Sequence, residues 1–147
     1  MDICNAHETL KSKHIRITKQ RLQIMQSILD ISNPFSVADV YALNSQIADL
    51  ATVYRFVRLL QQNSIIRSVA QFDDTQFYEK ACEHNPNHPH FLCKSCHHLI
   101  CLNTLRTSDV FRLAEYARFQ IVDDISVTYN GTCKECAEKL NKESGCV

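Results

Sequence analysis

Residues 82–101 read CEHNPNHPHFLCKSCHHLIC, and the side chains of this stretch predict both the chemistry and the layout of the chain. Its twenty positions hold four cysteines and five histidines: Cys82, Cys93, Cys96, Cys101, His84, His88, His90, His97 and His98. Thiolates and imidazoles are the ligands that Zn²⁺ prefers, in tetrahedral sets of four. Because the stretch offers more ligands than one ion needs, we expect two metal sites.

The first expected site joins two C-x2-C motifs that lie far apart in the chain. Cys93 and Cys96 form one motif, and Cys133 and Cys136, in GTCKEC, form the other. A duplicated C-x2-C motif is typical of a closed structural zinc site. The alternative is that these four residues are core cysteines without a metal.

The second expected site follows from the alternation of side chains along a strand. Apolar residues before Cys93 favour a strand, so His88 and His90 share a face that Cys93 does not. The ligands that remain for this face form a Cys2His2 set, Cys82, His88, His90 and Cys101. The alternative is a degenerate site, because an unligated cysteine is commonly an ordinary buried residue.

Composition indicates a folded chain with an uneven charge distribution. The 147 residues are 45% hydrophobic, with two glycines and three prolines. No apolar run has the length of a membrane span, and the first residues have no signal-peptide core, so we expect a cytoplasmic protein. Eight cysteines in a reducing compartment favour metal ligands over disulfides. Residues 1–67 hold eight Lys and Arg against five Asp and Glu, which suits a polyanionic partner.

The first half has the element order of a winged helix. Thr18, Ser36 and Asp49 are predicted N-caps of three amphipathic helices. Two alternating runs, separated by Asp73 and Asp74, then predict a β-hairpin. In a winged helix the third helix enters the DNA major groove. Inward positions of the second and third helices are expected at Val40, Leu43, Leu50, Val53, Val57 and Leu60.

The second half predicts a small α/β unit. We expect a helix over residues 108–117, with Val110, Leu113 and Ala114 inward, and a strand over residues 119–131. Residues 137–147 have the composition of a polar tail, in which Cys146 has no evident partner, and Cys4 lies in a similar tail at the other end. The predicted fold class is therefore α+β.

Three segments carry a family resemblance. They are ATVYRFVRLLQQNSII (51–66), HPHFLCKSC (88–96) and GTCKEC (131–136), in this order. Together they resemble the ferric uptake regulator (Fur) superfamily of bacterial metal-dependent transcription factors, over roughly residues 14–137. The resemblance implies a winged-helix DNA-binding domain at residues 1–81, a hinge at about 80–87, and a dimerisation and metal-binding domain at residues 88–147. It further implies a homodimer whose metal-loaded form binds a palindromic operator in double-stranded DNA.

The resemblance places the structural zinc and the regulatory metal on the two ligand sets described above. Other members commonly have carboxylates at the first and last regulatory positions, where this chain has Cys82 and Cys101. Two thiolates and two imidazoles suit tetrahedral Zn²⁺ and poorly serve octahedral Fe²⁺ or Mn²⁺. We therefore expect a repressor of metal-uptake genes similar to zinc uptake regulators, with two Zn²⁺ per monomer. An iron-, manganese- or peroxide-sensing member is the alternative, and Glu79 is a further possible ligand.

On the DNA side, the resemblance assigns base reading to Tyr54 and Arg55 in the third helix. Arginine can bind guanine through two hydrogen bonds, and a tyrosine ring can pack on a thymine methyl group. Phosphate contacts are expected from Arg16, Lys19, Arg21 and Arg58. The alternatives are that Tyr54 is a packing aromatic and that the basic residues form a solvated face.

Two other classes of protein also use Cys and His ligands for zinc. A zinc hydrolase or deaminase needs an open coordination position and a general base. The chain contains no H-E-x-x-H motif, and a saturated Cys2His2 site leaves no place for a reactive water, so we expect no enzyme. A zinc-ribbon interaction module that does not bind DNA is the third possibility.

Overall fold

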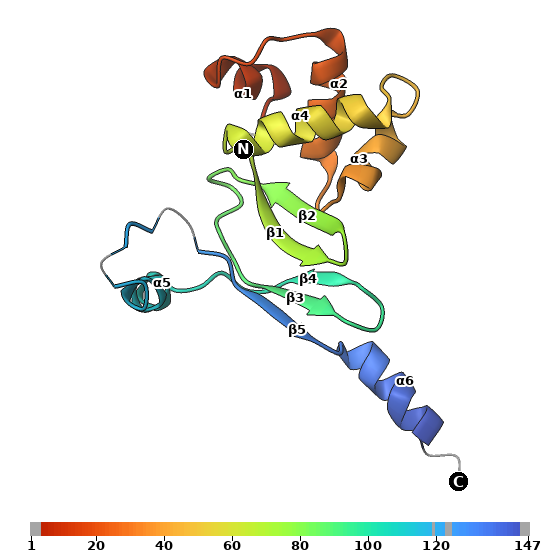
Figure 1. The fold of residues 1–147 in the computed structure, drawn as a ribbon, viewed down its shortest axis with the longest axis vertical. Coiled ribbons are helices and arrows are strands. Elements are labelled where there is room, and N and C mark those ends of the chain that lie inside the picture. The colour runs from red at the N-terminus through yellow and green to blue at the C-terminus, as the bar shows by residue number, and fades with distance from the viewer. Residues whose placement is uncertain (1–3, 119, 123–124, 145–147) are drawn as a thin grey trace. The chain divides into compact units, whose positions relative to one another are not determined.

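The chain forms two compact units, Met1–Pro86 and Asn87–Val147. The structure is a computed structural model that describes residues 4–118, 120–122 and 125–144 (Figure 1). Each unit has its own sheet: a two-stranded sheet in the first and a three-stranded sheet in the second.

The first unit begins with four helices whose starts are fixed by side-chain caps. The helices are α1 (Ala6–Ser12), α2 (Lys19–Asp30), α3 (Val37–Asn44) and α4 (Leu50–Gln62). Thr18 accepts a hydrogen bond from the Arg21 N–H, and Asp49 accepts one from the Thr52 N–H. Ser36 and Asp39 form a reciprocal capping box. The predicted starts of α2, α3 and α4 are thus confirmed.

Replacing Ser36 by alanine tests the contribution of the α3 cap. The Asp39 N–H donates to the Ser36 hydroxyl at 3.2 Å, and the Asp39 carboxylate accepts from the Ser36 N–H at 2.7 Å. Loss of such a cap lowers the free energy of unfolding by about 1 kcal/mol. Urea unfolding should therefore show a lower midpoint for Ser36→Ala. Ser45→Ala, at the exposed other end of α3, should stay within about 0.5 kcal/mol of wild type.

A hairpin follows the helices and completes the winged-helix arrangement. Strands β1 (Ile66–Phe72) and β2 (Thr75–Lys80) pair antiparallel, with an irregular register between Ser68 and Ala70. Asp73 has φ 47°, a left-handed conformation that aspartate tolerates in a tight turn. Phe35 also pairs with Tyr78 through two backbone hydrogen bonds of 2.8 and 2.9 Å. This bridge joins the segment before α3 to β2.

The helices of the first unit enclose a continuous hydrophobic core. Its fully buried members include Leu10, Ile24, Met25, Ile28, Val40, Val53, Val57 and Leu60. Two predicted inward residues are exposed instead, Leu43 by 62% and Leu50 by 52%. On α3 the buried face is formed by Val40 and Asn44, and Leu43 points away from it. Leu50 is the first residue of α4. Phe56, which sequence patterning did not single out, is buried.

In the second unit, the described residues form a short sheet and two helices. Strands β3 (His90–Cys93), β4 (Leu99–Cys101) and β5 (Thr128–Gly131) are ordered β4-β3-β5. β3 is antiparallel to β4 and parallel to β5. The helices are α5 (Thr107–Glu115) and α6 (Lys134–Ser144). Residues 137–144 are polar, as expected, but they form most of α6 and not an irregular tail, because Lys, Glu and Ala are good helix formers. Cys146 lies outside the described residues.

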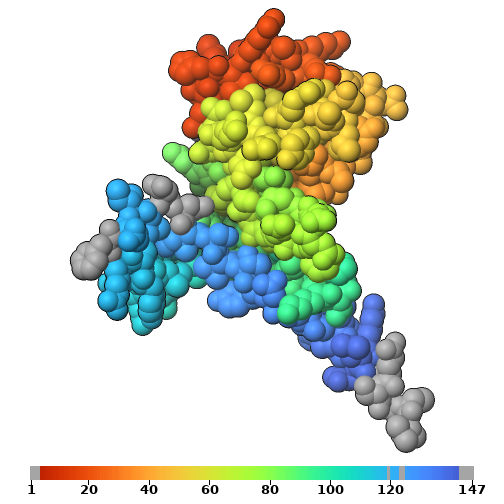
Figure 2. All heavy atoms as spheres, viewed as in Figure 1, coloured from red at the N-terminus to blue at the C-terminus, as the bar shows by residue number. Residues whose placement is uncertain are grey.

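The second unit buries few side chains. Among its described residues, Pro89, His90, Leu92, Cys93 and Leu99 are buried, and α5 contributes none. The predicted inward residues Val110 and Leu113 are 37% and 39% exposed. Both helices present much of their surface to solvent within this unit (Figure 2). A core of this size needs additional stabilisation, for which metal and oligomerisation are the usual sources.

No helix in the described part of the chain combines the length and the apolar character that a membrane crossing requires.

Candidate metal centres and DNA-binding surface

The four cysteines of the two C-x2-C motifs come together in the second unit. Parallel pairing of β3 with β5 places Gly131 beside Cys93, and Cys133 follows two residues later. The Lys94 N–H donates to the Gly131 carbonyl at 2.7 Å, which fixes the two segments side by side. Cys136 lies in the first turn of α6. We call Cys93, Cys96, Cys133 and Cys136 the structural cluster.

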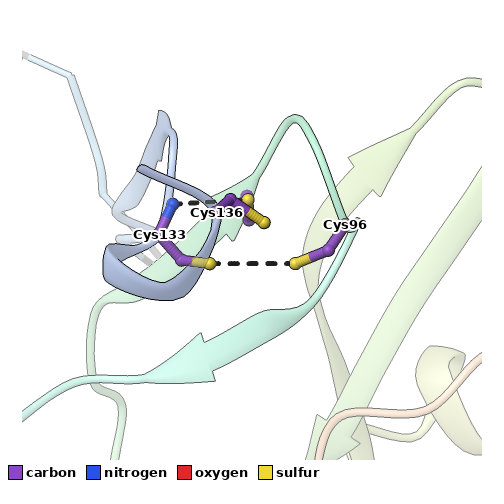
Figure 3. Close-up of side chains that lie close together, drawn as sticks. Cys96, Cys133 and Cys136 are labelled. Carbon is purple, nitrogen blue, oxygen red and sulfur yellow. Dashed lines mark hydrogen bonds between the residues drawn. The ribbon is translucent and has the colours of Figure 1, made fainter. Parts of the chain in front are cut away.

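The geometry of the structural cluster fits a tetrahedral zinc ion. The four sulfur atoms all lie within 4.8 Å of one another. Zn–S bonds of about 2.3 Å place the sulfurs of a tetrahedron about 3.8 Å apart. The Cys96 and Cys133 sulfurs are 3.9 Å apart and face each other across the site (Figure 3). The residues present therefore match the donor set and the spacing that a structural zinc requires.

Backbone donors prepare Cys93 to act as a thiolate. The Cys133 N–H donates to the Cys93 sulfur at 3.3 Å. This hydrogen bond, with those from the N–H groups of Cys96 and Ser95, lowers the pKa of Cys93 to about 5. The thiol of Cys133 and burial together raise the pKa of Cys136 to about 12. Four sulfurs this close cannot all be thiolates without a cation between them, and a bound cation deprotonates its thiol ligands.

Three residues of the predicted regulatory set also meet in the second unit. His90 pairs with Cys101 across β3 and β4. The rings of His88 and His90 have centroids 4.6 Å apart. Ligand atoms of His88, His90 and Cys101 lie within 4.8 Å of one another. We call these three residues the histidine cluster.

The remaining predicted ligands belong to the first unit. Cys82 follows β2, and its sulfur lies within 4.8 Å of ligand atoms of Cys4 and His84. Glu79, on β2, is buried and forms an ion pair with Arg67 at 2.6 Å. The grouping of Cys4 with Cys82 was not predicted, because 78 positions separate the two residues and no motif links them.

The predicted base-reading residues lie on the exposed side of α4. Tyr54, Arg55 and Arg58 are exposed, whereas Val53, Phe56 and Val57 between them are buried. One face of α4 therefore packs in the core, and the opposite face is open to solvent and to a binding partner. The Arg55 guanidinium donates to the Thr52 hydroxyl at 3.3 Å, which orients it along the helix.

The three basic residues near the start of α2 differ in their surroundings. Arg16 and Lys19 are exposed. Arg21 is half-buried: its guanidinium lies 5.8 Å from the centre of the Phe56 ring and donates to the Arg16 carbonyl at 2.9 Å. Arg21 therefore links α2 to α4 as well as contributing positive charge.

Comparison with known proteins agrees with these features. Residues 12–130 match the ferric uptake regulator family. The chain is 24% identical over 143 residues to the peroxide operon regulator of Bacillus subtilis, covering 95% of this chain and 97% of the relative. It superimposes on the ferric uptake regulator Fur of Helicobacter pylori with a TM-score of 0.69 at 18% identity, covering 89% and 88% of the two chains. A zinc uptake regulator complexed with zinc and DNA gives a TM-score of 0.61 at 20% identity, covering 92% and 93%.

The described residues form an N-terminal winged-helix unit and a small C-terminal α/β unit, which is the fold of ferric uptake regulator structures. The four sulfurs of the structural cluster have the spacing of a zinc site. The chain belongs to the ferric uptake regulator family, whose members are transcription regulators. It is thus a metal-responsive transcriptional regulator that binds DNA. Its relatives include regulators of iron uptake, zinc uptake and the peroxide response, so the family alone does not specify the metal.

Proposed function

We propose that this protein is a zinc-responsive repressor of metal-uptake genes that acts as a homodimer on a palindromic operator. The observation that carries the proposal is the presence of the Cys101 sulfur beside the imidazoles of His88 and His90. Thiolate with imidazole favours tetrahedral Zn²⁺, whereas Fe²⁺ and Mn²⁺ favour octahedral sets richer in oxygen. The structural cluster would hold a second zinc ion in each monomer.

A donor from the residues that precede the unit boundary completes the regulatory set in this proposal. Cys82 is the donor predicted from the sequence, and Glu79 is the other residue the segment offers. Arg67 already neutralises the Glu79 carboxylate, so recruiting Glu79 also changes that ion pair. With either donor, zinc binding at the regulatory set would depend on a residue that precedes the boundary between the two domains.

The regulatory ion would act through the difference in its affinity for two arrangements of the domains. A ligand shifts such an equilibrium only by this difference. Half-sites of an operator lie about one helical turn apart, so fixing the separation of the two α4 helices in a dimer raises affinity. Tyr54 and Arg55 would then read bases, while Arg16, Lys19, Arg21 and Arg58 would contact phosphates.

A metal titration of operator binding tests the proposed function. The operator is first selected from random DNA duplexes with the zinc-loaded protein, and binding is then measured against free Zn²⁺, Mn²⁺ and Fe²⁺. We expect Zn²⁺ to activate binding at the lowest concentration. For Cys101→Ser the required Zn²⁺ should rise at least about tenfold, because even changes outside the ligand set cost about 10–100-fold in metal affinity.

Three variants complete the design. Cys146→Ser removes a thiol that belongs to neither predicted ligand set and should respond like wild type. Cys82→Ser and Glu79→Gln identify the fourth donor, since only the true ligand should shift the zinc requirement as Cys101→Ser does. Activation by Fe²⁺ or Mn²⁺ at lower concentrations than Zn²⁺ would support an iron-, manganese- or peroxide-sensing regulator instead. An unchanged response of Cys101→Ser would exclude Cys101 as a ligand.

A further inference from the structure

We propose that Cys4, Cys82 and His84 form a third metal site, which binds Zn²⁺ within the DNA-binding domain. We call these residues the N-terminal cluster. Their ligand atoms all lie within 4.8 Å of one another, and the Cys4 sulfur is 3.9 Å from Nδ1 of His84. Two sulfurs and one imidazole nitrogen are the Cys2His donor set of three-ligand zinc sites, in which water takes the fourth position.

Hydrogen bonds position the cluster from both sides. On one side, Asn5 caps α1: its side chain accepts from the Glu8 N–H at 3.1 Å and its carbonyl from the Thr9 N–H at 2.9 Å. The cap holds the adjacent Cys4 in place, because α1 is anchored in the core by Leu10. Cys4 therefore directly precedes an anchored helix start.

On the other side, a hydrogen-bonded turn carries Cys82 and His84. The Asn85 N–H donates to the Cys82 carbonyl at 2.9 Å, and the Asn85 side chain donates to the Lys80 carbonyl at 2.7 Å. The Arg67 guanidinium donates to the Asn85 carbonyl at 2.8 Å. Preorganised ligands of this kind lower the ordering cost of binding an ion.

The surroundings leave space for the fourth ligand. A cavity of about 120 Å³, which is ample for a water molecule, is lined in part by Cys4 and Cys82, though His84 does not line it. Cys4 and Cys82 are half-buried and His84 is exposed. The exposed His84 gives an ion at this site access to solvent.

Occupancy would restrain the segment that leads to the unit boundary. Bound Zn²⁺ would join Cys4, which precedes α1, to the turn after β2. Cys82 in this turn lies four residues before the unit boundary at Pro86. This inference assigns Cys82 to the N-terminal cluster and so leaves Glu79 as the fourth donor of the proposed regulatory set. The two proposals remain separable, because Cys4 and His84 belong to the N-terminal cluster alone.

Zinc stoichiometry of the full-length protein tests the third site. Reduced protein is stripped of exchangeable metal and titrated with Zn²⁺ against a chromophoric chelator. Wild type should bind one more equivalent than Cys4→Ser and than His84→Asn. The matched controls Cys146→Ser and His7→Asn should bind as many as wild type; His7 is an exposed histidine on α1 outside the cluster. Retention of the extra equivalent by either cluster variant would overturn the proposal.

A second measurement requires no substitution. Alkylation of Cys4 in the wild-type protein is followed by peptide mass spectrometry with and without Zn²⁺. Zinc should slow Cys4 alkylation at least about tenfold, whereas Mg²⁺, a cation that prefers oxygen ligands, should leave the rate unchanged. An equal rate with and without Zn²⁺, or a Cys4–Cys82 disulfide that forms in place of zinc binding, would contradict the site. Cys101 is not part of the N-terminal cluster. A lost regulatory response in Cys101→Ser would therefore bear on the proposed function alone, and the zinc equivalent of the N-terminal cluster and the protection of Cys4 from alkylation should be unchanged.

Discussion

Replacing Cys133 by serine is expected to remove the structural zinc and to unfold residues 87–147. Three remaining sulfurs cannot close the tetrahedron, whereas serine keeps the backbone N–H that donates to the Cys93 sulfur, so the substitution removes the ligand atom alone. The carbonyl of residue 133, which accepts from the Ala137 N–H at 2.9 Å at the start of α6, is also kept by serine. Any loss of structure in this variant therefore follows from the loss of the metal ligand.

The expected effect is large because this domain has little else to stabilise it. Its described residues include only five that are buried, and one of these is the ligand Cys93. Structural zinc sites contribute about 10–16 kcal/mol of binding free energy in small zinc-dependent folds. A net stability of about 5–15 kcal/mol, usual for a whole protein, does not withstand a loss of that size.

Metal analysis and hydrogen exchange check this prediction. Cys133→Ser should contain one zinc fewer per chain, and the amides of β3, β4 and β5 should lose their protection. Cys101→Ser is the matched control, since Cys101 lies in the same sheet but outside the structural cluster; it should retain that zinc and that protection. Full protection of β3 in Cys133→Ser would show that the sheet folds without the ion.

Replacing Arg55 by alanine is expected to weaken operator binding by about 1–3 kcal/mol and to reduce discrimination between the operator and other sequences. Arg55 is exposed on α4, beside buried Phe56, so the core should hold the helix unchanged. Exposed substitutions of this kind usually change stability by less than about 0.5 kcal/mol. The loss should therefore appear in DNA binding and not in the unfolding midpoint.

Binding measured at several salt concentrations separates base reading from phosphate contact. Arg16→Ala removes a predicted phosphate contact at the start of α2. It should weaken operator and random DNA alike and reduce the salt slope by about one. If Arg55→Ala behaved in the same way, with specificity unchanged, then Arg55 would be a phosphate contact and base reading would lie elsewhere on α4.

The local sequence determined where three helices of the first domain begin. Thr18, Ser36 and Asp49 predicted three helix N-termini because an N-cap acts on N–H groups two or three residues away. The hairpin was readable for the same reason, since its turn and its alternation are local. Burial along the helices was less predictable: Leu43 and Leu50 are exposed because neighbouring helices, and not the periodicity alone, decide which positions are covered.

The spacing of C-x2-C motifs was sufficient to predict the structural cluster, because zinc chemistry restricts which residues can close a tetrahedron. Only the tertiary structure placed Cys4 beside Cys82 and His84, since their contact depends on how α1 packs against the core. The α6 helix was likewise not predicted, because few of its residues are apolar and its first backbone hydrogen bond goes to Cys133. Ligand motifs can be identified from the sequence because their spacing is local, whereas contacts between distant segments depend on how the helices and strands pack.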